Sequence, residues 1–595
     1  MKVSKIKIKN FRGINSSELL FPDHVVLIGD NNTGKSTVFE ALDLVLGPDR
    51  LNRRPVIDEH DFYNGEYLQK DDTTSTPKIT IEAVITNLSA EQQGHFKDYI
   101  EWWCTDKKAL HTSPPAGSID YDSIEAALRV SFIGEYDRDE DNFVGNTFFS
   151  RSIEESDTPV KFHKKDKQKC GFLYLRQLRT GSRALSLENG SLLDIILRIK
   201  EIRPQMWEKT LEEIGKFNVA SDPSIGISGV LESIDASIKK YVPREWGVTP
   251  HLKVSNLTRE HLRKLVTAFI ATGDGEHAAP FYRQGTGTLN ILVLAMLSQI
   301  AEDKQNVIFA MEEPETAIPP YTQKRIIHEI RKLSAQALFT SHSPYVLEEF
   351  LMEETVVLSR DNSGILKQLH IVLPDSIKQK KYRQDFRTRF CEGLLSRRVL
   401  IAEGATETSA MPIAARRLSE LKADDYTSFE ALGICTIDAG GESNISDFSS
   451  FYKSLGKQVF AVCDKQSDVN KKKIEKNVEK LFMHKEDGFE QLVLKGTTKV
   501  AIDRFIDTLE WPPHLKTKFP DPKSDPIKAL MEYFSRSKGN WGIADFLAQC
   551  EESDIPEWIK NTCKHIRSLC EGTPQRAIET TQIEGETPIN EDSTI

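Results

Sequence analysis

The sequence lacks the cysteine spacing of a zinc ribbon or of a disulfide-linked framework. Its eight cysteines are scattered along 595 residues, and none forms a CxxC pair. Structural zinc sites and small secreted domains usually carry cysteines in close pairs or dense frameworks. The pattern therefore argues against both, and it predicts buried or incidental thiols.

Long apolar runs are also missing. No stretch of about 18 apolar residues occurs, which is the length that a membrane-spanning helix needs. The first residues, MKVSKIKIKNF, alternate lysine with valine or isoleucine, which is a strand pattern and not that of a signal peptide. We therefore expect a cytoplasmic protein with no membrane partner.

The chain has no excess of positive charge, since its net charge is −11. This sum opposes nucleic-acid binding, because phosphate contacts need lysine and arginine. Two local clusters are nevertheless basic and could contact phosphates. They are Lys378, Lys380, Lys381, Arg383, Arg387 and Arg389, and Lys161, Lys164, Lys165, Lys167 and Lys169. Taken alone, each cluster favours a solvated face.

What the sequence does contain is an alternation of strand-like and helical segments. A chain of this length, with 39% hydrophobic and 28% charged residues, predicts a globular protein of two or three domains. Strands separated by helices recur after position 398, which predicts a parallel sheet between helices. Around 190–265 the pattern is helical, with Pro204, Pro223 and Pro243 as breaks.

The segment GDNNTGKS at 29–36 fits the pattern GxxxxGK[ST]. It follows the apolar strand VVLI and opens a helix, which is the context that a phosphate-binding loop requires. Its glycines allow backbone N–H groups to surround a phosphate, its lysine reaches the β- and γ-phosphates, and its serine ligates Mg²⁺. We expect ATP and Mg²⁺ here, bound by Gly29, Asn31, Asn32, Gly34, Lys35, Ser36 and Thr37.

A second strand, in VIFAMEEPE at 307–315, ends in two acids. Acids often follow strands, but a phosphate-binding loop upstream favours a functional interpretation. Glu312 is expected to hold the Mg²⁺, and Glu313 to orient or deprotonate the attacking water.

Further segments indicate the class of ATPase. YRQGTGTLNILVLAML has a glycine-rich turn before an apolar helix, ALFTSHSPYVL places His342 after a short strand, and NFRG follows the first strand. This ordered set resembles the ABC-type ATPases of the SMC and RecF group. The resemblance implies a homodimer or higher oligomer, in which Gly285, Thr286 and Gly287 cap the ATP of the other subunit and His342 is the switch histidine.

The segment RRVLIAEGATETSAM at 397–411 is another buried strand that ends in an acid, Glu403. Glu407 follows four residues later, so a helix starting at Gly404 brings the two carboxylates together. Two acids this close repel, and a bound cation such as Mg²⁺ relieves the repulsion. The strand VFAVCDKQSD at 459–468 ends in Asp464.

This strand set resembles a Toprim domain. An SMC-like head followed by Toprim resembles the OLD family of ATP-dependent endonucleases, whose relatives include the Gabija-type defence nuclease. The family's glutamate carries over to Glu403 and the first acid of its DxD to Asp464, but Gln466 stands at the second acid. Asp468 either turns back into the site or is a solvated acid.

The resemblance extends to two later positions. EDGFEQLVL at 486–494 matches the family's acidic position, with Glu490 as the first candidate and Glu486 and Asp487 as alternates. FSRSKGNWGIADFLAQ at 534–549 carries the lysine, Lys538. An exposed acid and a surface lysine are the competing interpretations.

The resemblance implies a DNA endonuclease regulated by ATP and dependent on Mg²⁺ or Mn²⁺, acting in anti-phage defence. Two cations are held by Glu403, Glu407, Asp464 and either Asp468 or Glu490, and Lys538 stabilises the transition state. A helicase or retron partner encoded nearby fits the family. The rivals are a repair ATPase whose Toprim part binds DNA without cutting, a primase-like polymerase, and an ABC transporter subunit.

The expected fold class is α/β, with an ABC-type P-loop ATPase that carries an inserted helical dimerisation arm, followed by a parallel α/β domain of the Toprim type. The expected divisions are an ATPase domain at 1–375 with the helical insertion at about 190–265, a basic linker at 376–398, a nuclease domain with a C-terminal helical part at 399–570, and a disordered acidic tail at 571–595.

Overall fold

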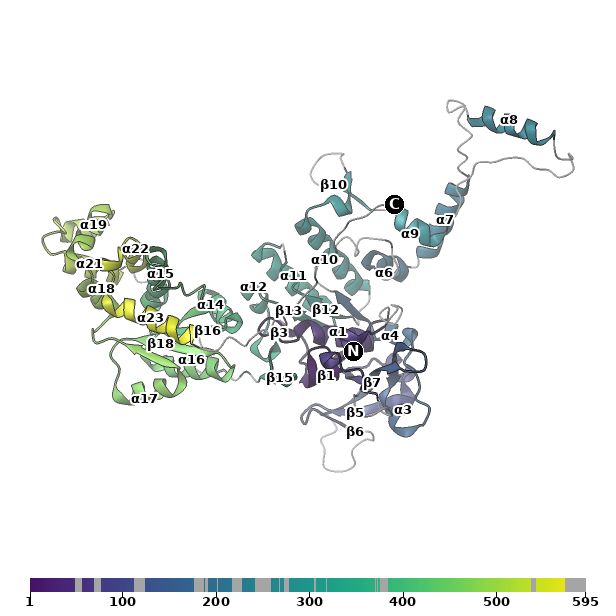
Figure 1. The fold of residues 1–595 in the computed structure, drawn as a ribbon, viewed down its shortest axis with the longest axis horizontal. Coiled ribbons are helices and arrows are strands. Elements are labelled where there is room, and N and C mark those ends of the chain that lie inside the picture. The colour runs from purple at the N-terminus through teal and green to yellow at the C-terminus, as the bar shows by residue number, and fades with distance from the viewer. Residues whose placement is uncertain are drawn as a thin grey trace, which may run out of the picture. The chain divides into compact units, whose positions relative to one another are not determined.

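A computed structural model describes most of the chain, and it divides into two compact units, Met1–Val372 and Leu373–Ile595. In Figure 1 unit 1 runs from purple to teal and unit 2 from green to yellow. The described residues are 1–48, 56–68, 76–111, 123–175, 187, 191–200, 202–216, 227–240, 258–266, 268–271, 278–303, 307–316, 318–369, 371, 373–374, 384–536 and 542–572. The expected acidic tail lies outside them, apart from its first two residues.

Unit 1 is organised around a sheet of 13 strands. These strands are β1 (Lys2–Phe11), β2 (Ile14–Leu20), β3 (Val25–Ile28), β4 (Ile79–Thr86), β5 (Ile100–Cys104), β6 (Ala109–His111), β7 (Ile124–Asp137), β8 (Asn142–Phe149), β9 (Phe172–Leu175), β12 (Ile308–Glu312), β13 (Gln336–Thr340), β14 (Thr355–Arg360) and β15 (Ile365–Leu369). A separate hairpin pairs β10 (Phe269–Ala271) with β11 (Ala278–Pro280).

The helices of unit 1 are α1 (Lys35–Leu46), α2 (Ala90–His95), α3 (Ser150–Glu155), α4 (Lys164–Cys170), α6 (Leu192–Ile199), α7 (Arg203–Lys216), α8 (Ile227–Ile238), α9 (Arg259–Leu265), α10 (Thr286–Asp303), α11 (Pro320–Leu333) and α12 (Pro344–Leu347). The segment expected to form a helical insertion contains α6 to α9. Pro204 lies in the first turn of α7, where its missing N–H has no helical partner to lose.

One half of the large sheet is parallel and buried. The order β14-β3-β13-β12-β9 is parallel at every pairing, and every residue of β3, β12 and β13 is buried. Parallel strands covered on both faces favour continuous apolar runs such as VVLI and IFAM. Their carboxyl ends meet at one edge, which places the loops after β3, β12 and β13 together.

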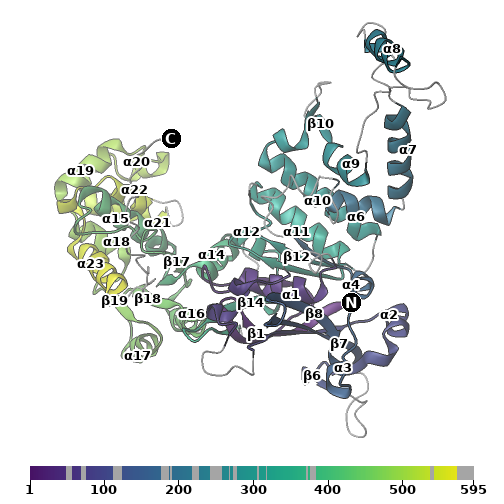
Figure 2. The ribbon, with the colours of Figure 1, turned by 45° about the vertical axis from the view of Figure 1, so that its right-hand side comes forward.

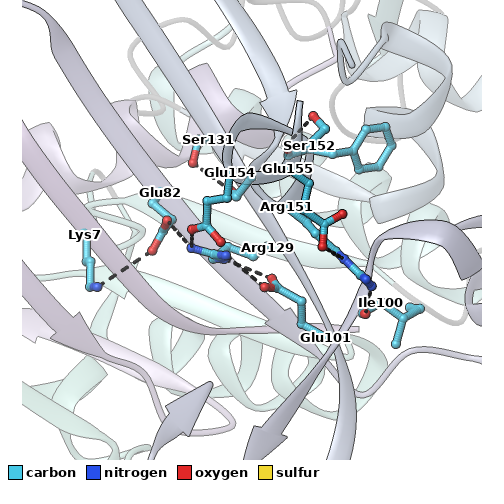
Figure 3. A network of polar contacts seen from close by, with 12 residues as sticks. Lys7, Glu82, Ile100, Glu101, Arg129, Ser131, Arg151, Ser152, Glu154 and Glu155 are labelled. Atoms are coloured by element: carbon cyan, nitrogen blue, oxygen red, sulfur yellow. Dashed lines mark hydrogen bonds and ion pairs between the residues drawn. The ribbon is translucent and has the colours of Figure 1, made fainter. Parts of the chain in front are cut away.

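The other half of the sheet is antiparallel, with β1 paired to both β2 and β4 and with β7 paired to β4, β5 and β8. Arg129 of β7 lies at the centre of a polar network there (Figure 3). It donates to both oxygens of Glu101 at 2.9 and 2.8 Å, and it also contacts Glu82 and Glu154. Because Glu101 is fully buried, this pairing satisfies a charge that would otherwise be costly inside the protein.

The basic cluster at 161–169 is not wholly a solvated face, so that interpretation is wrong for one member. Lys167 of α4 is fully buried, and its Nζ donates to the backbone oxygen of Leu44 at 2.7 Å. Lys161, Lys164, Lys165 and Lys169 are exposed. In the other cluster, Arg387 and Arg389 lie on α14 (Gln384–Leu395), while the remaining members fall outside the described residues.

Unit 2 holds a four-stranded parallel sheet in the order β17-β16-β18-β19. The strands are β16 (Arg398–Ala402), β17 (Ile434–Asp438), β18 (Gln458–Cys463) and β19 (Lys480–Met483). The helices besides α14 are α15 (Ala405–Leu421), α16 (Glu442–Ser454), α17 (Asp468–Asn477), α18 (Phe489–Gly496), α19 (Lys499–Thr508), α20 (Pro513–Lys518), α21 (Pro526–Arg536), α22 (Gly542–Ala548) and α23 (Glu557–Glu571).

Helices cover both faces of this second sheet (Figure 2). Leu400 and Phe460 share a core with α15 and with the helices of the C-terminal part. On the other face α16 packs against β16 and β18 through buried residues such as Phe448. Among the described residues, no helix is both long and apolar enough to cross a membrane.

Candidate functional site

The loop between β3 and α1 in unit 1 forms the expected phosphate-binding turn. Gly34 has φ 116° and Gly29 has φ 154°, which side chains other than glycine rarely adopt. A Cβ on Gly29 would also lie 2.7 Å from the backbone oxygen of Leu358. Asn31, Asn32 and Ser36 are exposed at the mouth of the loop, and Thr37 is partly buried.

Lys35 lies inside this loop. Its Nζ donates to the backbone oxygens of Gly29 at 2.8 Å and Asp30 at 3.0 Å, and the residue is only 8% exposed. Burial lowers the pKa of Lys35, while the charges of Asp30 and Glu313 oppose that shift. The loop therefore presents a partly desolvated cation at the start of helix α1, which suits a phosphate.

The acids after β12 lie at the same edge of the sheet. Glu312 pairs in register with Thr340 of β13, and the backbone N–H of Glu313 donates to the oxygen of Thr340 at 2.9 Å. Glu313 has φ 45°, a strained conformation for a side chain of its size. Partial burial and then the charge of Lys35 lower the pKa of His342, and Glu313 raises it. Lys35, Glu313 and His342 therefore form one electrostatic group.

Two further residues at this edge were not predicted from the sequence. The hydroxyl of Tyr174 on β9 donates to Glu312 Oε1 at 2.5 Å, and Glu315 Oε1 accepts the backbone N–H of His342 at 2.8 Å. Burial raises the pKa of Glu315. Glu315 could have been identified from the sequence, because it closes the motif EEPE at 312–315. No residue near Tyr174 in the sequence indicates its role, because its strand, β9, pairs with β12 only in the folded sheet.

The glycine-rich turn is placed at a helix start and not at the phosphate-binding loop. Gly285 directly precedes α10, and Thr286 and Gly287 open it. No hydrogen bond within the described ranges joins this turn to Lys35, Glu313 or His342. Its role across a dimer stays a prediction.

In unit 2, the acids lie at the point where the sheet order reverses. The chain passes from β16 to β17 on one side and then returns to β18 on the other, and in such sheets ligands bind at the carboxyl ends beside this switch. Glu403 follows β16 and Asp464 follows β18. Glu403 Oε2 accepts the backbone N–H of Asp464 at 3.1 Å.

Four carboxylates share this edge. Burial, followed by the charges of Asp464, Glu403 and Glu490, raises the pKa of Glu407 to about 7. Burial raises the pKa of Glu403 as well. Glu407 and Glu490 are each less than a tenth exposed. The structure therefore brings Glu403, Glu407, Asp464 and Glu490 together, in an arrangement whose repulsion a cation would relieve.

The alternates for the later acidic position lie elsewhere. Glu490 of α18 accepts a hydrogen bond from Thr406 at 3.2 Å, on the first turn of α15. Glu486 pairs instead with Lys495, and Asp487 is exposed. Asp468 is the exposed first residue of α17, and no hydrogen bond or ion pair within the described ranges joins it to the other acids. Lys538 lies outside the described residues.

Gln466 takes part in the cluster although it is neutral. Its Nε2 donates to Glu403 Oε2 at 3.1 Å, and its Oε1 is buried without a hydrogen-bond partner. The residue is 7% exposed. The neutral side chain at the second acid position therefore lies at the site itself.

His484 was not predicted to belong to this cluster. It follows β19 directly, and its Nε2 lies 2.7 Å from Asp464 Oδ1. Its ring packs edge-on against Trp558 and Phe489. The sequence signal for His484 is the apolar strand that ends in histidine, KLFMH.

The donor set suits a divalent cation without forming a finished site. No three His, Cys, Asp or Glu side chains of the described ranges converge to metal-binding geometry. The fit rests on the chemistry of four carboxylates and on buried oxygens without partners, Asp464 Oδ1 and Gln466 Oε1. Hard oxygen donors of this kind are what Mg²⁺ and Mn²⁺ take.

Comparison with known proteins identifies both units. A model described as AAA ATPase domain matches residues 1–180 and 191–347, and one described as Overcoming lysogenization defect protein-like, TOPRIM domain matches residues 394–465. The Old nuclease of Escherichia phage P2 is 21% identical, over 79% of this chain and 78% of that protein. The OLD nuclease of Thermus scotoductus is 21% identical, over 76% and 80%.

Two solved structures show more distant likenesses. The SMC head domain from Thermotoga maritima is 12% identical, with a TM-score of 0.29, over 63% of this chain and 100% of that one. The C-terminal region of the Xanthomonas campestris OLD protein is 18% identical, with a TM-score of 0.23, over 30% and 96%. The family assignment does not depend on them.

The α/β fold class and the expected resemblance are confirmed by the two matched domains and by relatives that align over most of the chain. The protein is an enzyme with an ATPase domain and a Toprim nuclease domain. The chain belongs to the family described as AAA ATPase domain, whose model matches more than half of it, and its residues 394–465 match an OLD-like Toprim domain.

Proposed function

We propose that this protein is a DNA endonuclease that depends on a divalent metal and is regulated by ATP. The observation that carries the proposal is that Glu403 and Asp464, which follow β16 and β18, share one edge of the sheet with Glu407 and Glu490 from the first turns of α15 and α18. Burial and the charges of the other three acids raise the pKa of Glu407 to about 7. The nuclease relatives support phosphodiester hydrolysis as the reaction.

Glu403 and Asp464 would hold the first cation, and Glu407 with Glu490 would hold or orient a second. When bound, Mg²⁺ or Mn²⁺ supplies an activated water and stabilises the leaving 3′-oxygen. Asp468 would join these ligands only if the start of α17 moved toward the acids. Lys538 would neutralise charge developing on the scissile phosphate.

The ATPase unit would regulate cutting. Gly29, Asn31, Asn32, Gly34, Lys35, Ser36 and Thr37 would bind the phosphates and Mg²⁺ of ATP, with Glu312 holding the same ion and Glu313 acting on the attacking water. Gly285, Thr286 and Gly287 would cap the nucleotide of a second subunit, and His342 would sense the γ-phosphate. This arrangement requires a homodimer, or a higher oligomer built from such dimers.

Plasmid cleavage tests the proposal. Supercoiled DNA is incubated with Mg²⁺ or Mn²⁺, with and without ATP, and with wild type, Glu403→Ala and Lys35→Ala. Nicking by wild type that is lost in Glu403→Ala, and that no longer responds to ATP in Lys35→Ala, supports the proposal. If neither metal supports any cutting, the nuclease assignment is wrong.

Gln466 favours one rival, a repair-type ATPase whose Toprim part binds DNA without cutting, because an amide is a weaker ligand than a carboxylate. In that case DNA binding would survive in Glu403→Ala and no strand would be cut by wild type. The role in anti-phage defence, and a helicase or retron partner, belong to the same proposal. Neighbouring genes and phage plating on cells with and without the gene test them.

A further inference from the structure

His484 is a buried polar side chain for which the nuclease site described above has no role. It is 2% exposed, and neither Nδ1 nor Nε2 has a hydrogen-bond partner. Burying polar nitrogen atoms in this state costs free energy. The ring is held in place by Trp558 and Phe489, so its position at the end of β19 is fixed by packing.

His484 and Asp464 are as close as an ion pair, but their contact does not have the geometry of a hydrogen bond. Nε2 and Oδ1 lie 2.7 Å apart, yet both atoms remain without a hydrogen-bond partner, so the ring N–H direction does not point at the carboxylate. Two atoms bound at right angles to one ion at about 2.0–2.1 Å lie about 2.9 Å apart, each aimed at the ion. The observed separation is close to that value.

A third donor without a partner lies close by, because the backbone N–H of Gln466 contacts Sδ of Met483, the residue before His484, at 3.4 Å. Gln466 Oε1 is buried without a partner, while its Nε2 is held by Glu403 Oε2 at 3.1 Å. Asp464, Gln466 and His484 thus contribute an unsatisfied carboxylate oxygen, amide oxygen and imidazole nitrogen. They come from the carboxyl ends of two paired strands, β18 and β19.

We propose that His484 is a metal ligand through Nε2 and that, with Asp464 and Gln466, it makes one cation position of the nuclease site a mixed nitrogen and oxygen site. This inference rests on the proposed function. Imidazole binds Mn²⁺, Co²⁺ and Zn²⁺ in preference to Mg²⁺, which prefers oxygen, and replacing an acid by Gln466 removes charge that favours Mg²⁺. The site therefore prefers first-row transition ions, with Mn²⁺ or Co²⁺ as the activating class.

The nitrogen ligand has a direct spectroscopic signature. The full-length protein is stripped of metal and titrated with Mn²⁺ without nucleotide, because the P-loop ion is held mainly by phosphates. Pulsed electron paramagnetic resonance of bound Mn²⁺ is expected to show ¹⁴N coupling, replaced by ¹⁵N coupling in protein labelled with ¹⁵N-histidine. Absence of nitrogen coupling in wild type overturns the proposal.

Variants assign the nitrogen among the 14 histidines. His484→Gln is expected to lose the coupling and to weaken Mn²⁺ binding by about tenfold or more, while Mg²⁺ binding changes by less than about threefold. His514→Gln, on the exposed side of α20, is the matched control and is expected to match wild type. Coupling that persists in His484→Gln overturns the assignment.

Gln466→Asp provides a second variant that keeps His484 in place. It is expected to raise Mg²⁺ affinity by about tenfold, because a second carboxylate restores an oxygen-rich site. The ratio of Mn²⁺ affinity to Mg²⁺ affinity is expected to decrease. Unchanged Mg²⁺ affinity in this variant counts against the mixed site.

The two proposals can fail separately. If Mn²⁺ shows nitrogen coupling but no metal supports DNA cleavage, the metal site stands and the nuclease function fails. If wild type cuts DNA with Mg²⁺ and Mn²⁺ equally well and shows no nitrogen coupling, the nuclease stands and His484 is a packed core residue.

Discussion

At the scale of single residues, polar atoms at the strand ends are held by neighbours that the sequence does not place beside them. Tyr174 contacts Glu312 from β9, and Gln466 contacts Glu403 from the segment between β18 and α17. Such contacts fix the direction of a carboxylate before any ligand binds. Preorganised groups of this kind contribute to binding and catalysis because less ordering remains to be done.

Tyr174→Phe is expected to lower ATP hydrolysis about tenfold, equivalent to about 1.4 kcal/mol, because Glu312 loses a hydrogen bond to its charged form. Binding of nucleotide to the loop at Lys35 is expected to stay near the wild-type level. Steady-state hydrolysis and nucleotide titration measure the two effects. Tyr282→Phe, at an exposed position, is the control, and equal loss in both variants would contradict a specific role for Tyr174.

At the scale of elements, the site depends on strands that deliver side chains and helices that begin beside them. β16 with α15, and β3 with α1, each place an acid or a phosphate-binding loop at a carboxyl edge. The position of α1 is fixed at its far end by α4, where buried Lys167 donates to the carbonyl of Leu44. A cation near a helix C-terminus is favourable, but burial opposes its charge.

Lys167 gives unit 1 a pH-dependent stability. Burial lowers the pKa of Lys167 from 10.5 to about 7. Between about pH 7 and pH 10 the unfolded chain binds a proton here that the folded chain does not, so the stability contributed by this group rises with pH by about 1.4 kcal/mol per unit. Lys167→Met lacks this dependence.

The unfolding free energy of Lys167→Met minus that of wild type is therefore expected to decrease as pH rises from 7 to 9, because only wild type gains stability with pH. Denaturant unfolding at pH 7, 8 and 9 measures it. Lys165→Met, an exposed position on the same helix, should show no trend. If this difference does not change with pH, Lys167 has the same protonation state in the folded and the unfolded chain between pH 7 and pH 9, and the prediction is wrong.

Local patterns allowed much of this arrangement to be predicted. The loop at Gly29–Ser36, the strand ending at Glu312 and the strand ending at Glu403 were each identifiable because the chemistry and the fold signal lie within a few adjacent residues. Glu407 followed from helical spacing alone. Each of these motifs follows a short apolar strand that is fully buried in the sheet, so the apolar run in the sequence predicts the strand correctly.

Other features depend on which strands become neighbours. His484 and Asp464 are 20 positions apart and meet only because β19 pairs with β18. Tyr174 meets Glu312 through the pairing of β9 with β12. Lys167 belongs to a basic run that favours solvent, yet the fold buries it under α1. Tertiary pairing, not local propensity, decides all three.

At the scale of the whole molecule, an ATPase unit and a nuclease unit share one chain of 595 residues. Each unit has its own sheet and its own core. Regulation of DNA cleavage by ATP therefore has to be measured as a coupling between the two activities. A change at the ATP site that leaves DNA cleavage unaffected would show that the two sites are not coupled.

Glu313→Gln is expected to reduce ATP hydrolysis by about 10² to 10⁴-fold, the usual contribution of a general base, while nucleotide binding persists. The ATP-bound form then accumulates, so the effect of ATP on DNA cleavage should keep its wild-type sign and become larger and constant in time. Hydrolysis and nicking assays on the same preparations measure both. No effect of ATP on nicking in either protein would contradict the coupling.

We propose that the acids of unit 2 cut DNA with the help of a divalent metal. The most direct measurement compares nicking of supercoiled plasmid by wild type, Glu403→Gln and Glu420→Gln, each with Mn²⁺ and Mg²⁺. Glu420 is an exposed acid on α15, the helix that follows Glu403. The predicted result is metal-dependent nicking that is unchanged in Glu420→Gln and lost by at least about 10²-fold in Glu403→Gln. Equal nicking by all three proteins would contradict the claim.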